Sequence, residues 1–336
     1  MNVSEARGKR IFSGIQPTGE PHLGNYIGAI RRWVDLQRDH ESFFCIVDLH
    51  ALSLPWDPLL LDERSRQTGA SLIACGIDPR RAIVFRQSQV TQHTELAWIL
   101  TCLSRMGELR RMVQFKEKSK GDTESVGTGV FTYPVLQAAD VLLYRAHGVP
   151  VGEDQRQHVE LMRDLGTRFN KSLGKTFVIP EAWIGAEGAR IMALDDPTQK
   201  MSKSSTRPNA AVSLGDAPEV VAKKIKSAVT DSGREVTAGE DKPALTNLLT
   251  IFSVAEGTPV PELEERYREG GYAPFKQALA DAVVAHLSPI RQRYEELLGD
   301  PAELDRLLTA GARRATEVAE VTMVDVRARA GLAHRI

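Results

Sequence analysis

Two lysines lie close together in the segment from Lys200 to Ser204, which reads Lys-Met-Ser-Lys-Ser. The ammonium groups of Lys200 and Lys203 are separated by one apolar residue and one small hydroxyl side chain. Such a pair is better suited to polyphosphate than to a carboxylate partner. Pro197 before the segment and Pro208 after it predict a loop. For this pentapeptide taken alone, a solvated basic turn is the alternative.

A second group of possible phosphate ligands lies near the N-terminus. An expected strand at Arg10–Ser13 ends in Gly14-Ile15-Gln16-Pro17-Thr18-Gly19, and an amphipathic helix is expected from His22 onward. A strand, a Gly/Pro turn and a helix form the first unit of a nucleotide-binding sheet, and His22 and Asn25 add side-chain donors there. The alternative is that Thr18 and Asn25 only cap the helix and that His22 is a surface turn residue.

Two further expected strands end in polar residues. The apolar run Phe43–Val47 is typical of a buried parallel strand and leads into Asp48-Leu49-His50. The strand Val149–Val151 leads into Gly152-Glu153-Asp154. Polar residues at the carboxyl ends of parallel strands point into the ligand crevice, and a Gly-x-Asp turn lets the backbone approach a ligand while the carboxylate accepts from a ribose hydroxyl.

The helix expected from Tyr133 to Tyr144 carries polar side chains in an apolar setting. Gln137 and Asp140 are three residues apart and therefore share one face, which Tyr133 joins. A carboxylate on an apolar helix needs a hydrogen-bond donor. Either a ligand supplies that donor, or a backbone NH or a serine of the core does.

Composition predicts an ordinary globular protein. The 336 residues suffice for two domains, and 42% hydrophobic with 26% charged residues argue against disorder. The net charge is -1, so nucleic acid would need a local basic patch. Three widely spaced cysteines, Cys45, Cys75 and Cys102, are expected to be buried reduced thiols. The polar N-terminus and the lack of a long uncharged run predict a cytoplasmic protein that does not cross a membrane.

The pattern changes after Pro208 from apolar strands to helices. The expected fold is therefore an α/β doubly wound parallel sheet followed by a separate all-helical domain. Further elements expected in the first part are helices at 62–75 and 95–115 and strands at 82–87 and 191–194. Helices expected in the second part are 219–229, 245–252, 261–267 and 275–298.

Four motifs taken in order resemble those of the class I aminoacyl-tRNA synthetases. They are 14–19, His22-Leu23-Gly24-Asn25, Gly152-Glu153-Asp154-Gln155 and 200–204. Over nearly the whole chain the resemblance is greatest to the bacterial tryptophanyl-tRNA synthetases. It implies a Rossmann-like catalytic domain at 1–206 that binds ATP and tryptophan, and a helical domain at 207–336 that reads the tRNA anticodon, with a last helix that can pack back on the catalytic domain.

The resemblance also implies a reaction and partners. L-tryptophan and ATP would form tryptophanyl-adenylate and pyrophosphate, and the tryptophanyl group would then pass to tRNA(Trp). Mg²⁺ would arrive with ATP and have no dedicated protein site. The family is homodimeric, and residues 98–112 are the expected interface.

Site residues carried over from the family fall into three sets. The catalytic set is Lys200, Lys203, His22, Asn25 and Lys118. The ATP set is Gln16, Thr18, His22, Gly24, Asn25, Gly152, Asp154, Gln155, Lys200, Met201, Ser202 and Lys203. The amino-acid set is Phe12, Gly14, Gln16, Val47, His50, Tyr133, Gln137, Asp140, Val141, Val149, Val151 and Gln155, with Asp140 as the acceptor for the indole NH.

Three alternatives remain open at this point. Gln137 stands where several bacterial relatives have methionine, and together with Tyr133 and Asp140 it also resembles the tyrosyl enzymes. A non-catalytic or regulatory paralogue is a second alternative, against which the intact Lys200 and Lys203 argue. A nucleotidyltransferase with an acceptor other than tRNA is the third, but such an enzyme would not need the helical domain.

Overall fold

The computed structural model describes residues 8–113, 127–185, 190–202 and 207–333. Its centre is a five-stranded parallel sheet with the strand order β3-β2-β1-β4-β5. The strands are β1 (Arg10–Ile15), β2 (Glu41–Ile46), β3 (Ile83–Arg86), β4 (Gly148–Val151) and β5 (Glu181–Ile184). The chain moves outward from β1 to β3 and then returns to β4 beside β1. This reversal is the doubly wound topology, and it confirms the expected fold class.

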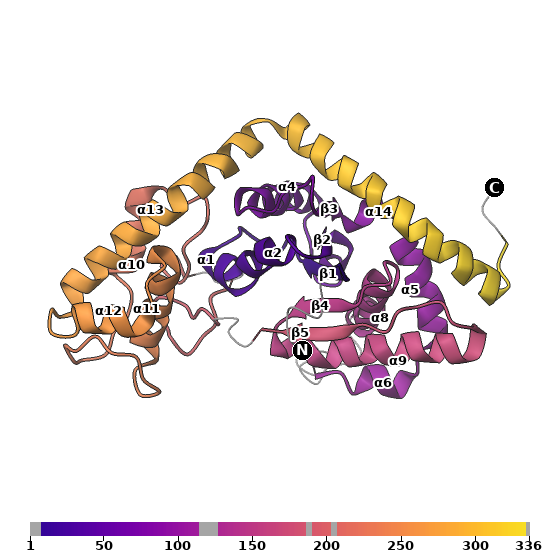
Figure 1. Ribbon diagram of the computed structural model, residues 1–336, viewed down its shortest axis with the longest axis horizontal. Coiled ribbons are helices and arrows are strands. Elements are labelled where there is room, and N and C mark those ends of the chain that lie inside the picture. Colours follow the sequence, from indigo (N-terminus) through magenta and orange to yellow (C-terminus); the bar gives the residue numbers. More distant parts are fainter. Residues whose placement is uncertain (1–7, 114–126, 186–189, 203–206, 334–336) are drawn as a thin grey trace.

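Helices join the strands and cover both faces of the sheet (Figure 1). The first crossover contains α1 (Leu23–Asn25), a π-helical turn (Tyr26–Ile30) and α2 (Arg31–Leu36). The others contain α3 (Asp48–Ala51), α4 (Pro58–Ala74), α5 (Gln92–Leu103), α6 (Met106–Arg110), α8 (Thr128–Leu142) and α9 (Arg156–Leu173), with 3₁₀ turns at Gln87–Gln89 and Glu153–Gln155.

The central strand β2 shows why the sheet is buried on both sides. Phe43 and Cys45 belong to one hydrophobic cluster, while Phe44 and Ile46 belong to the other. Because successive strand side chains point to opposite faces, an uninterrupted apolar run serves two cores at once.

The second part of the chain is helical. It contains α10 (Pro218–Lys226), α11 (Pro243–Glu256), α12 (Val260–Tyr267), α13 (Tyr272–Gly299) and α14 (Pro301–Ala330). Figure 1 shows α13 and α14 meeting at an angle above the sheet. The helical part shares a hydrophobic cluster with one face of the sheet, and the His286 ring on α13 is hydrogen-bonded to the Tyr26 hydroxyl at 2.9 Å.

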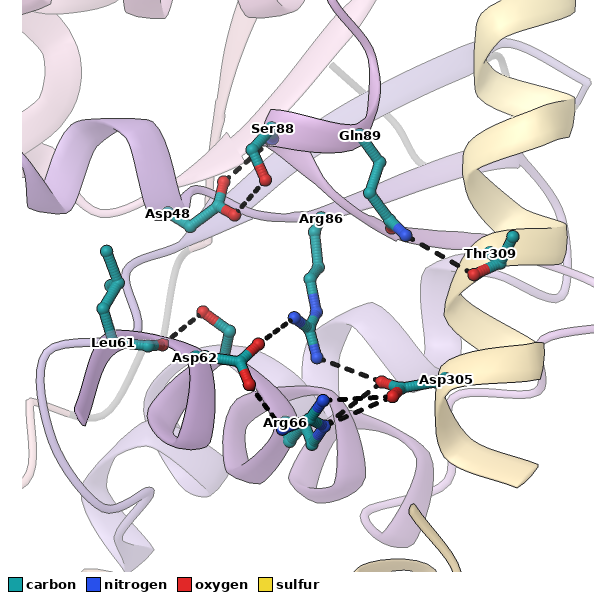
Figure 2. Close-up of polar contacts among 10 residues, drawn as sticks. Asp48, Leu61, Asp62, Arg66, Arg86, Ser88, Gln89, Asp305 and Thr309 are labelled. Carbon is teal, nitrogen blue, oxygen red and sulfur yellow. Dashed lines mark hydrogen bonds and ion pairs between the residues drawn. The ribbon is translucent and has the colours of Figure 1, made fainter. Parts of the chain in front are cut away.

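Helix α14 returns across the sheet edge formed by β3. Figure 2 shows Arg86, at the end of β3, between the carboxylates of Asp62 on α4 and Asp305 on α14. The Arg86 nitrogens lie 2.7 Å from Asp62 and 3.2 Å from Asp305. Arg66 on α4 pairs with both carboxylates. The network therefore joins one strand to two helices distant in the sequence.

Three details of the sequence prediction were wrong. Residues 191–194 form no sheet strand: Met192 makes one isolated bridge with Lys200, and the fifth strand is β5. The helix expected at 95–115 is divided between α5 and α6, and its last two residues lie outside the described part of the chain. Cys45 and Cys75 are buried as expected, but Cys102 is exposed.

No helix of the described residues is long and apolar enough to cross a membrane.

A single glycine permits the approach of α14 to β3. A Cβ atom at Gly311 would lie 1.8 Å from the Val84 carbonyl oxygen. Gly311→Ala should therefore lower the free energy of unfolding by about 1 to 3 kcal/mol, although alanine ordinarily favours a helix. Urea unfolding followed by circular dichroism measures the change. Gly299→Ala is the control, since nothing lies within 4 Å of its added methyl group. Equal stability of the two variants would contradict the close contact.

Candidate active site

A cavity of about 490 Å³ opens where β1 and β4 diverge, at the point where the strand order reverses. Open α/β sheets bind ligands at such a switch point. Members of three sequence motifs line the cavity: His22, Gly24, Asn25, Val151, Gly152, Asp154, Lys200 and Met201. The structure therefore brings together residues that the sequence places far apart.

His22 begins the first helix as its N-cap. Its Nδ1 accepts from the Asn25 backbone NH at 3.3 Å, and the Asn25 Oδ1 accepts from the His22 NH at 3.2 Å. This reciprocal pair is a capping box. Only 4% of His22 is exposed, so the alternative of a surface turn residue was wrong. His22 and Asn25 can cap the helix and line the cavity at the same time, because the capping hydrogen bonds hold both side chains at the cavity wall.

Gly24 and Met201 bring the two candidate phosphate-binding motifs into contact. A Cβ at Gly24 would lie 3.2 Å from the Met201 Cβ and 3.0 Å from the His22 Nδ1, so a larger residue would push the motifs apart. Met201 is 2% exposed, and its NH donates to the Ile191 carbonyl at 3.0 Å. The apolar residue thus anchors the loop, while Lys200 stays exposed at the rim of the cavity.

The chain that follows the lysine loop also supports the first motif. The Leu23 NH donates to the Val212 carbonyl at 2.9 Å, and the Leu214 NH donates to the Pro21 carbonyl at 3.0 Å. Thr18, His22 and Ser202 line an adjoining cavity of about 570 Å³. The lysine-loop segment and the entrance of the first helix are therefore two walls of one region.

A chain of amide hydrogen bonds connects α8 to the turn after β4. Gln137 Nε2 donates to Gln155 Oε1 at 3.2 Å, and Gln155 Nε2 donates to Asp154 Oδ2 at 3.1 Å. Asp154 is exposed at the cavity. Gln137 thus belongs to a polar path toward the crevice.

Asp140 is 1% exposed and receives three side-chain donors. Oδ1 accepts from Gln87 Nε2 at 2.7 Å and lies 2.6 Å from His93 Nδ1. Oδ2 lies 2.8 Å from His50 Nε2. Burial would raise the pKa of Asp140, but the hydrogen bonds from His50 and His93 hold it well below its usual range. The carboxylate is therefore an acceptor.

The donors to Asp140 are imidazoles and an amide, whereas the sequence had suggested a backbone NH or a serine for a structural role. Gln87 and His93 were missed. Gln87 directly follows β3. Polar residues at the carboxyl ends of parallel strands point into the ligand crevice, so the argument made for the end of β2 would have indicated Gln87 as well. His93 gave no sequence signal. Asp48, expected to face the crevice, instead accepts from the Ser88 NH at 2.9 Å and ties the ends of β2 and β3 together (Figure 2).

The other members of the predicted amino-acid set differ in burial and in contacts. Tyr133 is hydrogen-bonded to His158 at 2.9 Å, and its ring lies edge-on to His50. A Cβ at Gly14 would lie 2.8 Å from Val47 Cγ1. Gln16 is half-buried just after β1. The apolar members lie in the cluster on the α8 face of the sheet: Phe12, Val47, Val141 and Val149, with Val151 packed against it. Lys118 and Lys203 lie outside the described residues.

The chain is similar over most of its length to known tRNA synthetases. The family model described as tRNA synthetases class I (W and Y) matches residues 5–288. "Tryptophan--tRNA ligase 2" of Streptomyces avermitilis is 50% identical over 325 residues, which are 96% of each chain. The crystal structure of tryptophanyl-tRNA synthetase from Mycoplasma pneumoniae is 36% identical with a TM-score of 0.87, covering 97% of this chain and 98% of that one. The enzyme from Campylobacter jejuni, complexed with ADP and tryptophan, is 35% identical with a TM-score of 0.84, covering 96% and 100%.

Proposed function

Because the chain belongs to the class I tRNA synthetases of the tryptophan and tyrosine family, we propose that it is a tryptophan–tRNA ligase. It activates L-tryptophan with ATP and transfers the tryptophanyl group to tRNA(Trp). The observation that carries this proposal is that residues of the His22–Asn25, Gly152–Asp154 and Lys200–Met201 segments line one cavity at the strand switch point.

The first step needs positioning more than acid–base chemistry. A tryptophan carboxylate oxygen attacks the α-phosphorus of ATP, the bond to the bridging oxygen breaks, and pyrophosphate leaves with the electron pair. No general base is required, since the nucleophile is already an anion. Catalysis therefore depends on holding the two reactants in line and on stabilising the charge that gathers on pyrophosphate.

Lys200 at the cavity rim, with His22 and Asn25 at its wall, supplies cationic and polar groups toward the phosphates. We assign Lys203 and Lys118 to the same task from the family resemblance. Gly152 and Asp154 face the nucleoside end of ATP. The described residues contain no group of three carboxylate, histidine or cysteine side chains that could hold a metal ion. Magnesium, which neutralises phosphate charge, would arrive with ATP, as the family resemblance implies.

The choice of amino acid rests on Asp140 and on the relatives. A carboxylate offers about four acceptor positions, and three side-chain donors occupy positions on Asp140, which leaves one on Oδ2 for a ring NH. The relative from C. jejuni is complexed with tryptophan, and the relative at 50% identity is named for tryptophan. The relatives favour tryptophan over tyrosine despite Gln137, whereas Asp140 only disfavours rings that carry no donor.

The helical part is the proposed tRNA-reading domain, with a division near residue 206. Helix α10 carries Lys223, Lys224 and Lys226 in its last turns, although Lys224 is already paired with Asp216 at 2.7 Å. Unstacked anticodon bases need such donors and stacking surfaces. Because the tRNA partner works in the cytoplasm, the enzyme is placed there as well.

Exposed apolar side chains on α5 and α6 support a homodimer. Trp98 is 69% exposed and Met106 is 60% exposed. Trp98 also lines a cavity of about 310 Å³ together with His50 and Tyr133 of the amino-acid site. Large exposed apolar groups in one region mark protein interfaces. A second copy covering this face would complete the wall beside the amino-acid site.

Amino-acid-dependent pyrophosphate exchange and tRNA charging test the function directly. Purified enzyme should charge tRNA(Trp) with tryptophan and reject phenylalanine, because a buried acceptor left without a donor costs about 1 to 3 kcal/mol or more. Tyrosine, whose hydroxyl can donate, is the critical competitor. A preference for tyrosine would make the chain a tyrosyl enzyme, and adenylate formation without charging would indicate a paralogue with another role.

Lys200→Ala should slow pyrophosphate exchange by on the order of 100-fold, since a group that meets charge developing in the transition state is worth a few kcal/mol. Tryptophan binding measured without ATP should stay unchanged. Lys175→Ala, at an exposed lysine after α9, is the matched control and should retain full activity. Near-parental exchange by the Lys200 variant would remove that lysine from the phosphate-binding role.

Trp98→Glu should shift the protein from dimer to monomer in sedimentation velocity, because a charge would be placed in an apolar interface. Leu332→Glu changes another exposed apolar residue, 47% exposed and just beyond the end of α14, and should leave the dimer intact. A monomeric parent protein, or a dimer that survives the Trp98 change, would place the interface elsewhere.

A further inference from the structure

Two of the donors to Asp140, Gln87 and His93, each make a second hydrogen bond that fixes their orientation. Gln87 is fully buried, and its Oε1 accepts from the Leu49 NH at 3.1 Å. This second bond fixes the orientation of the amide, so that its Nε2 faces the carboxylate. Gln87 can therefore donate to Asp140 but cannot turn an oxygen toward it without losing the Leu49 bond.

His93 is held in the same manner by a tyrosine. The His93 ring is fully buried, with Nδ1 at 2.6 Å from Asp140 Oδ1 and Nε2 at 2.8 Å from the Tyr144 hydroxyl. An ionised carboxylate only accepts, so Nδ1 must carry a proton. In the neutral ring, Nε2 then accepts from the Tyr144 O–H. Tyr144 therefore donates to His93, and His93 donates to Asp140.

Tyr144 is fixed by the aromatic core. It is fully buried, its ring is stacked on Phe43 with centroids 4.5 Å apart, and it is stacked on Phe12 at 5.5 Å. Phe85 meets it edge-on at 5.8 Å. The hydroxyl therefore has a defined place, because rings packed on three sides cannot swing away. Phe12 also belongs to the proposed amino-acid site, so Tyr144 contacts that site by packing as well as through His93.

We propose that His93 and Tyr144 are positioning residues that hold Asp140 as a pure acceptor, so that the amino-acid site requires a hydrogen-bond donor on the ring of its substrate. This inference rests on the proposed function and deepens it. Neither residue touches the substrate in this account. They act through Asp140, whose remaining Oδ2 position selects rings that carry an N–H.

The requirement for a donor has a chemical consequence. A ring of the same shape that lacks the N–H leaves a buried anion with an empty acceptor position, which disfavours binding. If Tyr144 loses its hydroxyl, His93 Nε2 loses its donor, and the ring gains freedom to turn or to exchange its proton between the two nitrogens. Asp140 then loses its fixed orientation, and the penalty against the wrong ring falls.

The test compares tryptophan with benzothienyl-L-alanine, in which sulfur replaces the indole N–H. The parent enzyme should prefer tryptophan in kcat/KM for pyrophosphate exchange by at least about 100-fold. Tyr144→Phe should reduce this preference about tenfold, chiefly through a higher KM for tryptophan, while kcat and the KM for ATP change little. A purely structural role would weaken both substrates equally and leave the ratio unchanged, and that result would overturn the inference.

Two variants of His93 keep the test decisive if Tyr144→Phe does not fold. In His93→Asn the amide nitrogen lies near the former Nδ1 position and can still donate to Asp140. In His93→Gln the amide lies near the former Nε2 position, next to Tyr144 and away from Asp140. The asparagine variant should therefore keep more of the preference for tryptophan. Equal preference in the two variants would contradict the positioning role.

A matched control separates this effect from the general loss of a buried hydroxyl. Tyr294→Phe, at a buried tyrosine on α13, should leave the substrate ratio unchanged. The outcomes also separate the two proposals. A parent enzyme that activates tryptophan and its sulfur analogue equally well refutes the inference but not the function. A parent that activates neither refutes the function, and the inference falls with it.

Discussion

The contact between Gly24 and Met201 is the constraint on which the candidate active site depends. It joins a glycine of the first helix to an apolar residue of the lysine loop, and a Cβ at Gly24 would already crowd both His22 and Met201. Because Met201 is buried, the loop has an anchor within its basic sequence. Burial of one methionine thus determines where an exposed lysine can lie, and the cavity at the strand switch point takes its shape from this contact.

The amino-acid side of the site follows the opposite principle. There the organising group is a buried charge, which is unfavourable in an apolar core unless donors surround it. Asp140 meets this condition with donors from three different segments of the chain: His50 on α3, Gln87 after β3 and His93 on α5. Because the buried charge needs all three donors, the segments that carry these donors can be arranged in only a few ways. The carboxylate is therefore a requirement on the fold as well as a possible substrate contact.

The sequence predicted those features of the fold and of the site that depend on residues close together in the chain. The apolar run at Phe43 is a buried strand because it supplies both faces of the sheet, and the motif at His22 starts a helix. What failed is non-local. The short strand β5 begins with an exposed glutamate and has only three consecutive apolar residues, all partly exposed, so its place beside β4 comes from pairing. His50 was predicted, and Gln87 could have been predicted from its place at the end of β3, but their contacts with Asp140 and the role of His93 could not, because these segments meet only in the folded chain.

At the end of β3, three consecutive residues connect helices α4 and α14 to the amino-acid site. Arg86 is held between Asp62 of α4 and Asp305 of α14 (Figure 2). The next residue, Gln87, donates to Asp140, and Ser88 donates to Asp48. A shift of α14 along β3 would pull on Arg86, and the short 3₁₀ turn that follows has little slack to absorb the movement. Gly311 prevents that shift by allowing α14 to lie directly on the Val84 carbonyl. The C-terminal helix therefore helps to set the position of a carboxylate donor that it does not touch.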